Sequence, residues 1–487
     1  MSAGKAANVV IDRRKFIKNA AIAGGALAGA TALSGCRGLY PTGFQPGSSL
    51  IDGLASDCGI DTVVVVMMEN RSFDHWLGWL ATHENYLEQG RSRYGAGFGI
   101  DGNQHQTYTG PTGLVDTAYL PNWDKTTDPW RGCGFGDPGH SWTAGRAQRD
   151  GGFLATGANN SEFALGYYGA SDLPFSSRLA KRFTTFDGYH CSILGPTYPN
   201  REYLNAAQSG GIKNNYLPLA EGGFLWETIW DRFAAAGVPA RSYYSDLPVL
   251  ALWGNRLMPY VSQISNYFTD CASGSLPNVV FVDPAFVGDN RNDDHPLADI
   301  CAGQGFLRDV FQAFAKSNHW ERGLFVATYD EWGGFFDHAA PPHLPDDRTN
   351  AIDAEDFSQA GFRVPTVMAS PFARPGFVDS RTYDHTSVLR FLEWRFLGAP
   401  PEGPGAEGDN WFLTQRDRYA NNLGASLMAE SFSPDIWFDP ASLEVGTPSP
   451  VCAPIAPTPG IAAANFGPLD NAFDEDKWAL YLDTLNF

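Results

Sequence analysis

Asp61 to Gly78 reads DTVVVVMMENRSFDHWLG, and this stretch decides the fold. Its apolar, β-branched run, Thr62 to Met68, predicts a strand that is buried on both faces, as the strands of parallel sheets are. The strand ends at Glu69 and Asn70, and in open α/β sheets ligand sites form at such carboxyl ends. These two polar side chains could hold a hard cation, or they could cap the helix that follows.

A second apolar strand is expected at residues 324–329, and it too ends in acids, Asp330 and Glu331. Alternating strands and helices predict an α/β fold, a sandwich with a mostly parallel central sheet. Shorter apolar runs predict the other strands of this sheet, at residues 182–187, 241–245, 279–282 and 365–370. Helices are expected at about residues 224–236, 297–317 and 387–396, with another beginning near Arg201.

The composition narrows the class of protein. The chain has 487 residues, of which 43% are hydrophobic, so a substantial core can form. The formal net charge is −20, which argues against nucleic acid or an anionic membrane as an electrostatic partner. Gly (53 residues) and Pro (33 residues) are frequent, so we expect long loops.

The first 36 residues are predicted to be an export signal. Arg13 and Arg14 precede an Ala- and Gly-rich run that is too short for a permanent membrane span, which is typical of twin-arginine signals. The signal ends in Leu-Ser-Gly-Cys36, which is similar to a bacterial lipobox. We therefore expect export by the twin-arginine machinery to the cell envelope, periplasm or exterior, with a lipid anchor on Cys36. The alternative is a signal that is cut elsewhere, with Cys36 incidental.

The other cysteines suit an oxidising compartment, because their number is even and permits up to three disulfides. None has CxxC spacing, so a zinc knuckle is not expected. Their pairing stays open, and some of them could be buried thiols. They are Cys58, Cys133, Cys191, Cys271, Cys301 and Cys452.

Three segments outside the regular pattern complete the domain organisation. Residues 37–60 are rich in Gly, Pro and Ser and predict a tether. The main domain is expected over residues 61–400, with a loop-rich insertion at 84–180. Residues 401–487 predict an irregular extension packed on the same domain.

Oxygen-bearing side chains at the two strand ends suggest a metal site. Glu69, Asn70, Asp330 and Glu331 offer hard ligands for one divalent cation, suited to Ca²⁺, Mg²⁺ or Mn²⁺, with Fe and Zn also open. Thr197 lies in a proline-stiffened turn before a helix, where a metal could activate its hydroxyl as a nucleophile. The acids could equally form an ordinary turn, and Thr197 could merely stabilise a loop.

Three histidines are candidates for contacts with an anion. His140, His295 and His385 could bind phosphate oxygens or give a proton to a leaving alkoxide. His385 could instead cap its helix, because single histidines often serve structural hydrogen bonds.

Five motifs, in this order, resemble those of the bacterial phosphoesterase family, which contains phosphatidylcholine-type phospholipases C and a secreted acid phosphatase. The resemblance covers roughly residues 60–400, and five ordered motifs are far more specific than any single one. It implies an alkaline-phosphatase-like α/β fold. The motifs are ENRSFDH (69–75), GPTYPNR (195–201), DDHP (293–296), YDEWGGFFDH (329–338) and YDHTSVLRF (383–391).

The resemblance also implies roles for individual residues. Thr197 would be the nucleophile and a metal ligand, and the reaction would pass through a phosphothreonine. His295 or His385 would protonate the leaving group. Trp332 departs from the family pattern, where a smaller or polar residue is expected. The implied metal ligands are Glu69, Asn70, Thr197, Asp330 and Glu331, and the implied phosphate-lining residues are His140, His295 and His385.

The resulting hypothesis is an exported, metal-dependent phosphoesterase of the phospholipase C type, acting on phospholipid or another phosphate ester. An acid phosphatase acting on monoesters is the alternative enzyme. A surface lipoprotein that binds phosphorylated ligands without catalysis is the alternative from another class. Aromatic residues of the insertion could cage a choline ammonium or could be core, namely Trp123, Trp130 and Trp142.

Overall fold

The structure is a computed structural model. The predicted export signal with Cys36 and nearly all of the tether lie outside its described residues, as do Trp123, Trp130, Cys133 and Cys452. None of the described helices is both long enough and apolar enough to cross a membrane. The structure describes residues 48–122, 136–296, 298–348, 355–406, 409–431, 439–440, 443–447 and 473–485.

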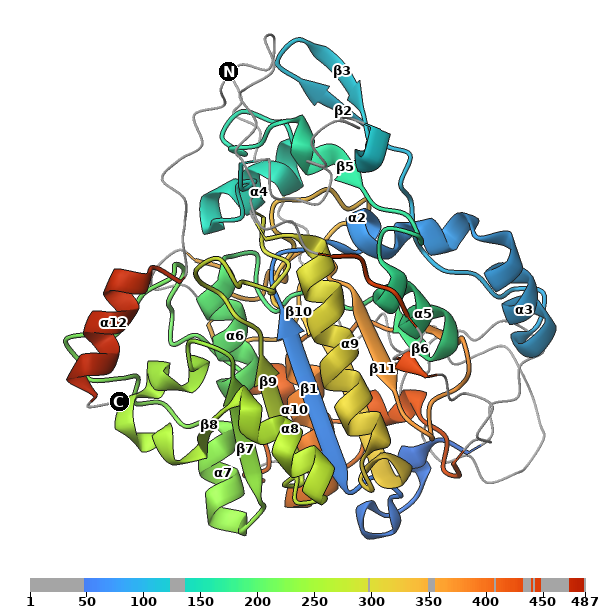
Figure 1. The fold of residues 1–487 in the computed structure, drawn as a ribbon. Helices are drawn as coiled ribbons and strands as arrows, with labels where there is room; N and C mark the ends of the chain where they lie inside the picture. The colour runs from blue at the N-terminus through green and yellow to red at the C-terminus, as the bar shows by residue number, and fades with distance from the viewer. Residues whose placement is uncertain are drawn as a thin grey trace, which may run out of the picture. The chain divides into compact units, whose positions relative to one another are not determined.

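Eight strands form the central sheet, in the order β12-β6-β11-β10-β1-β9-β7-β8 (Figure 1). Neighbouring strands pair in parallel, except where β11 lies antiparallel between β10 and β6. The predicted α/β class with a mostly parallel sheet is therefore confirmed. The strands are β1 Thr62–Met68, β6 Thr184–Phe186, β7 Ala240–Tyr244, β8 Val261–Gln263, β9 Val279–Asp283, β10 Gly323–Tyr329, β11 Thr366–Ala369 and β12 Val378–Asp379.

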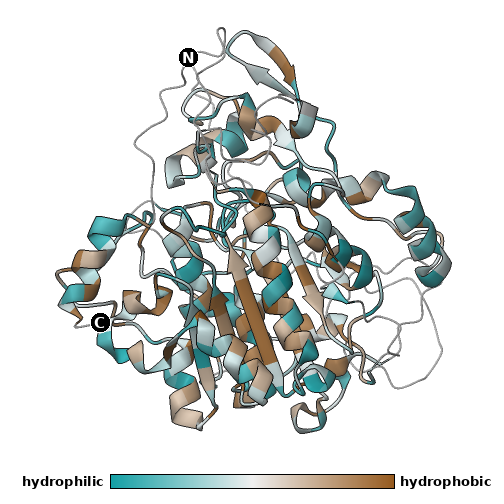
Figure 2. Ribbon diagram, viewed as in Figure 1, coloured by the Kyte–Doolittle hydropathy of each residue, from teal (hydrophilic) through white to brown (hydrophobic). Residues whose placement is uncertain are grey.

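The centre of the sheet is the pair of apolar strands β1 and β10. All seven residues of each strand are buried, and β1 is among the most hydrophobic parts of the ribbon in Figure 2. The two strands run in parallel with Met68 beside Tyr329. Because the register is level at this end, Glu69 and Asp330 leave the sheet side by side. The sheet thus brings together two acidic segments that are about 260 positions apart in the sequence.

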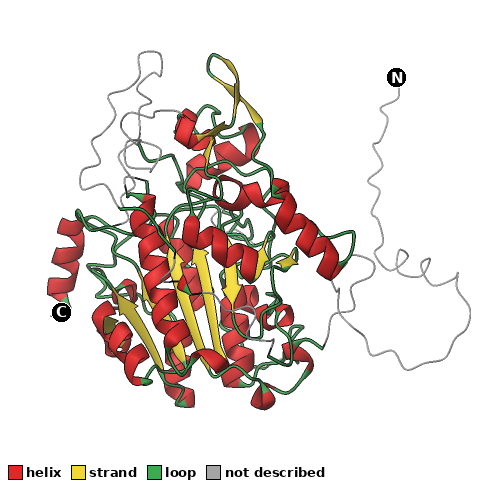
Figure 3. Cartoon of the chain, turned by 45° about the vertical axis from the view of Figure 1, so that its right-hand side comes forward, coloured by secondary structure: helices red, strands yellow, loops and turns green. Residues whose placement is uncertain are grey.

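Helices cover both faces of the sheet (Figure 3). On the face towards the viewer in Figure 1, α9 (Ile300–Lys316) contacts α5 (Pro174–Arg182) and α8 (Ile264–Ser273). Behind the sheet, α10 (Thr386–Leu392) contacts α6 (Thr197–Ala206). The predicted helix at 224–236 is shorter, since α7 spans Ile229–Ala236 and begins at the side-chain cap of Thr228.

The predicted loop-rich insertion contains more regular structure than its sequence pattern suggests. It contributes α3 (Glu84–Tyr94) and α4 (Trp142–Gly151), which lies beyond the carboxyl end of β1 in Figure 1. Its short strands are β2 Thr107–Gly110, β3 Gly113–Asp116, β4 Ala118–Tyr119 and β5 Gly166–Tyr167. Tertiary contacts stabilise such short elements, and local periodicity therefore reveals them poorly.

Contacts with α4 also explain the unexpected tryptophan of the fourth motif. Trp332 is fully buried, and its indole N–H donates a hydrogen bond of 2.8 Å to Oε1 of Gln148. Its ring lies so close to Gly145 that a Cβ at that position would be 2.8 Å from it. A large aromatic residue is accommodated because α4 presents a glycine there.

The C-terminal extension is held on the main domain by its described parts. In α12 (Glu475–Thr484), Trp478 donates a 2.5 Å hydrogen bond to the hydroxyl of Tyr198, which is next to Thr197. The extension also contributes α11 (Gln415–Arg418). Three of the cysteines considered above are buried free thiols, namely Cys58, Cys191 and Cys271.

Candidate active site

Glu69 and Asn70 follow β1 and are completely buried. Oε1 of Glu69 accepts a 2.8 Å hydrogen bond from Nε of Arg201. Asn70 has a positive φ of 60°, which is uncommon for a residue with a side chain. Its backbone N–H donates to Oδ1 of Asp330 at 3.0 Å, while its side-chain Oδ1 and Nδ2 have no hydrogen-bond partner in the described chain. The backbone is therefore held in an unusual conformation that leaves a buried amide unused.

Asp330 and Glu331 follow β10 and are buried as well. Each of these carboxylates has one oxygen that accepts backbone N–H groups and one that has no hydrogen-bond partner among the described residues. Oδ1 of Asp330 accepts from Asn70 and Glu331, and Oε2 of Glu331 accepts from Gly333 at 2.7 Å. Oδ2 of Asp330 and Oε1 of Glu331 are without a hydrogen-bond partner. The backbone thus orients both side chains and leaves an oxygen of each available.

Electrostatics favour a further positive charge in this cluster, in addition to that of Arg201. Burial, together with the neighbouring Asp330 carboxylate, holds the pKa values of Glu69 and Glu331 well above their usual range. The unused oxygens of Asn70, Asp330 and Glu331 are hard donors, which is the chemistry that a divalent cation requires. The predicted ligand residues therefore fit a cation, although the donor set does not distinguish between Ca²⁺, Mg²⁺, Mn²⁺, Fe and Zn.

Thr197 is the first residue of α6, rather than part of the turn before it as predicted. Its hydroxyl donates a 3.3 Å hydrogen bond to Oε2 of Glu69, so α6 places it beside the acidic cluster. Asn200 holds the preceding turn, because its Nδ2 donates to the carbonyl oxygens of Gly195 and Pro196. The hydroxyl therefore sits at the first residue of a helix, next to the acidic cluster.

Arg201 is a site residue that was not recognised from the sequence. It is buried one turn after Thr197, and it joins Glu69 to Asp283 at the end of β9, where Nη1 is 2.9 Å from Oδ1. Its Nη2 donates to the carbonyl of Met67 at 3.1 Å. The signal was its i+4 spacing from Thr197, which places both side chains on one face of the helix.

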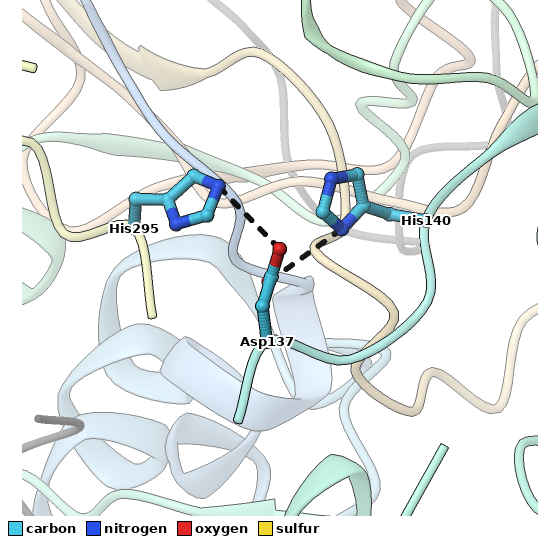
Figure 4. Close-up of side chains that lie close together, drawn as sticks. All are labelled: Asp137, His140 and His295. Carbon is cyan, nitrogen blue, oxygen red and sulfur yellow. Dashed lines mark ion pairs between the residues drawn. The ribbon is translucent and has the colours of Figure 1, made fainter. Parts of the chain in front are cut away.

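His140 and His295 lie on either side of Asp137 (Figure 4). Nε2 of His295 is 3.8 Å from Oδ2 of Asp137, and Nδ1 of His140 is 3.7 Å from Oδ1. Nε2 of His140 is 4.0 Å from Oε1 of Glu331, which places the three residues next to the acidic cluster. Asp137 was not singled out from the sequence, although it stands three positions before His140.

His385 occupies a different position from the other two histidines. Its Nε2 donates a 2.6 Å hydrogen bond to the backbone carbonyl of Asp330, and its Nδ1 lies 3.5 Å from the hydroxyl of Tyr189. Burial lowers its pKa. The ring of His385 therefore holds the backbone of Asp330, a candidate metal ligand, in place.

Similarity to known proteins identifies the family to which this chain belongs. The model of the Phosphoesterase family matches residues 60–397, which include every one of these buried residues. The chain belongs to the phosphoesterase family. It is therefore a phosphoric ester hydrolase, and a non-catalytic binding protein is set aside.

Several curated relatives of this phosphoesterase are phospholipases C. It is 30% identical over 396 residues to non-specific phospholipase C6 of Arabidopsis thaliana, covering 74% of this chain and 71% of that protein. It is 28% identical to phospholipase C A of Mycobacterium tuberculosis, and the match covers 70% of this chain and 73% of that protein. It is also 28% identical to the non-hemolytic phospholipase C of Burkholderia pseudomallei, and the match covers 69% of this chain and 55% of that protein.

Likeness of the phosphoesterase to solved structures is low. The lipoteichoic acid synthase LtaP of Listeria monocytogenes is 9% identical, with a TM-score of 0.34 and coverage of 52% of this chain and 70% of that one. A protein in the alkaline phosphatase superfamily from Vibrio parahaemolyticus is 11% identical, with a TM-score of 0.30 and coverage of 56% and 70%. The α/β assignment rests on the sheet topology given above.

Proposed function

We propose that this phosphoesterase is a phospholipase C-type enzyme that hydrolyses phosphodiester head groups, such as that of phosphatidylcholine, through a phosphothreonine. The observation that carries the proposal is the hydroxyl of Thr197, which is bonded to Glu69 at the N-terminus of α6. A nucleophile and a carboxylate that accepts its hydrogen bond then lie side by side in the candidate site. The names of the curated relatives support a phospholipase C rather than another phosphoesterase.

In the first step Oγ1 of Thr197 attacks phosphorus in line with the leaving oxygen, its proton passes to Oε2 of Glu69, and the bond from phosphorus to the leaving oxygen breaks. Glu69 orients the hydroxyl, and Arg201 holds Glu69 in position. A divalent cation, bound by Glu69, Asn70, Asp330 and Glu331 together with Thr197, would lower the pKa of the hydroxyl and neutralise charge on the phosphoryl oxygens. Water then hydrolyses the phosphothreonine and regenerates the enzyme.

The histidines have different roles in this proposal. His140 and His295 line the phosphate side of the site, and protonated His295 gives its proton to the leaving oxygen. His385, which the sequence offered as a second proton donor, acts as a positioning residue because its Nε2 is committed to the carbonyl of Asp330.

A caging role for Trp142 is not favoured by its surroundings. The guanidinium carbon of Arg146 lies 3.4 Å from the centre of its ring, so a protein cation already covers one face. Recognition of a choline head group would therefore depend on other residues.

A substrate panel tests the activity. Purified mature protein should release diacylglycerol from phosphatidylcholine vesicles and should hydrolyse p-nitrophenyl phosphorylcholine faster than p-nitrophenyl phosphate. The reverse preference would identify an acid phosphatase acting on monoesters, the alternative with the same core. The panel is run on metal-stripped protein and on protein reloaded with each of the five candidate cations, which also identifies the metal.

Export and anchoring are proposed from the N-terminal sequence alone. The paired arginines Arg13 and Arg14 support export by the twin-arginine machinery, and the Leu-Ser-Gly-Cys36 ending supports a lipid anchor. Arg13→Lys with Arg14→Lys should retain the protein in the cytoplasm. Cys36→Ser should release it from the membrane fraction, and a protein that stays there would contradict the anchor.

A further inference from the structure

Arg416 is a buried arginine of the C-terminal extension, and it lies outside residues 60–397, which the family model matches. It belongs to the short helix α11, and only 1% of its surface is exposed. A buried guanidinium has lost its hydration, so each of its N–H groups needs an acceptor from the protein. The acceptors of Arg416 therefore show which parts of the chain this residue holds in place.

Every N–H group of the Arg416 guanidinium donates a hydrogen bond. The acceptors come from segments of the main domain that are far apart in the sequence, so the side chain joins parts of the fold that no single helix or strand connects. They are the carbonyl oxygens of Ser192, Pro345 and Phe357 and the carboxylate oxygens Oδ2 of Asp346 and Oδ2 of Asp384.

One of these acceptors lies at the start of the turn that leads to Thr197. Nη1 of Arg416 donates to the carbonyl of Ser192 at 2.5 Å. Asn200 of α6 holds the same turn, because its Oδ1 accepts from the backbone N–H of Ile193 at 3.0 Å. The turn is therefore held by both α6 and the C-terminal extension, and the position of Thr197 depends on both.

A second chain of contacts leads from Arg416 to His385. Nη1 of Arg416 also donates to Oδ2 of Asp384 at 3.1 Å, and Oδ1 of Asp384 accepts from the backbone N–H of Thr386 at 3.1 Å. His385 lies between these two residues, and its Nε2 donates to the carbonyl of Asp330. Arg416 therefore holds the segment from which His385 reaches a candidate metal ligand.

We propose that Arg416 is a positioning residue of this phosphoesterase, which fixes the turn before Thr197 relative to the segment of His385. The C-terminal extension is then part of the scaffold of the active site. This inference rests on the proposed function, because it takes Thr197 as the nucleophile and Asp330 as a metal ligand. Lysine would keep the charge at position 416, but its single nitrogen cannot replace the planar fork of the guanidinium.

Kinetics of Arg416→Lys test the positioning role. The variant should lower kcat by about 10- to 100-fold, because small displacements of reacting groups are costly, and should leave KM nearly unchanged. The substrate is whichever p-nitrophenyl ester the wild type hydrolyses faster, the phosphorylcholine diester or the monoester, so the measurement does not depend on that preference.

Arg390 offers a matched control. It is also buried, and it fastens the same extension by donating to the carbonyls of Arg418, Pro400 and Gly403. These bonds do not hold the turn before Thr197 or the segment of Asp384. Arg390→Lys should therefore lower the thermal stability while keeping kcat close to that of the wild type.

Hydrogen exchange gives a readout that needs neither substrate nor metal. Arg416→Lys should speed amide exchange in residues 192–197 and 383–387 and leave the central strands as in the wild type, whereas Arg390→Lys should not affect those two segments. Thermal unfolding shows whether each variant is folded. If Arg416→Lys does not fold, Asp384→Asn takes its place, because the amide keeps the bond to Thr386 and weakens only the ion pair. It should show a smaller decrease in kcat.

The inference is overturned if a folded Arg416→Lys or Asp384→Asn variant keeps the kcat of the wild type. It is also overturned if exchange in the two segments is unchanged, or if Arg390→Lys lowers kcat as much as Arg416→Lys. Failure of the proposed function would show elsewhere, as a wild type that prefers the monoester or as an active Thr197→Ala variant.

Discussion

The hydroxyl of Thr197 donates a 3.3 Å hydrogen bond to Oε2 of Glu69, although 128 positions separate the two residues in the sequence. Thr197 begins α6 and Glu69 directly follows β1, so the bond joins the start of a helix to the carboxyl end of the central strand. Both residues are completely buried. The hydrogen bond places the hydroxyl of Thr197, the proposed nucleophile, against the acidic cluster, and the first prediction follows from this position.

Removing the hydroxyl should abolish turnover. Thr197→Ala is expected to lower kcat for p-nitrophenyl phosphorylcholine by a factor on the order of 10³ or more, because no other group would attack phosphorus. Thr197→Ser keeps the oxygen and should retain measurable activity. Circular dichroism checks that both variants fold. Activity of the alanine variant close to that of the wild type would rule out Thr197 as the nucleophile.

Arg201 should be important for stability as well as for the site. Arg201→Ala leaves Glu69 and Asp283 buried without their shared partner, and breaking a buried ion pair in this way costs about 3–5 kcal/mol. Urea denaturation measures the resulting decrease in the free energy of unfolding. The control is Arg91→Ala, which removes an exposed ion pair with Glu84 and should cost less than about 1 kcal/mol. Equal decreases in the free energy of unfolding for the two variants would contradict the predicted importance of Arg201 for stability.

Gly333 should tolerate no side chain. Its φ is +63°, and a Cβ would lie 2.3 Å from the carbonyl oxygen of Asn70, so Gly333→Ala must displace a candidate metal ligand. We expect a loss of activity of about 100-fold or more, since small displacements in an active site are costly. Gly237→Ala is the matched control, because its φ is +69° and nothing lies within 4 Å of its added Cβ. It should cost only about 1 kcal/mol of backbone strain and leave activity unchanged.

The His338 cluster predicts a pH-dependent component of stability. A hydrogen bond to Asp74 raises the pKa of His338 to about 9, and Asp101, Asp337 and Arg363 are the other charged groups around the ring. Because the folded pKa is the higher one, this stabilisation is fully present below about pH 6.5 and is lost as the pH rises through 9. The side chain is 24% exposed, so solvent screening should reduce the contribution to about 1 kcal/mol.

Urea denaturation between pH 6 and pH 10 measures this component. The free energy of unfolding of the wild type should fall across this range more steeply than that of His338→Gln. His343→Gln is the control, because His343 is exposed and bonds only surface groups, and it should follow the wild type. Parallel curves for the wild type and His338→Gln would contradict the prediction.

Much of the fold could be predicted because burial leaves a strong pattern. Thr62–Met68 is a strand with the expected bounds, and the strand before Asp330 begins only one residue earlier than expected, since a strand that is buried on both faces must be apolar throughout. The helices of the insertion were not predicted, because α4 is stabilised by its contacts around Trp332 rather than by its own periodicity.

Some residues of the candidate site could likewise be named from the sequence, and others could not. Residues directly after a buried strand, such as Glu69 and Asp330, could be named from the sequence because their position follows from that of the strand. Asp137 and Arg201 could not, because their roles depend on partners from other elements. His385 was named, but only the structure relates its ring to the backbone of Asp330.

The sequence by itself determined the α/β class, the two acidic strand ends and the phosphoesterase motifs, because apolar runs and short motifs are local properties. Tertiary structure decided which polar atoms meet. The level register of β1 and β10 sets Glu69 beside Asp330, and α6 then brings Thr197 to Glu69. Side-chain hydrogen bonds act over only about 3 Å, so partners that lie far apart in the sequence can be assigned only once the chain is folded.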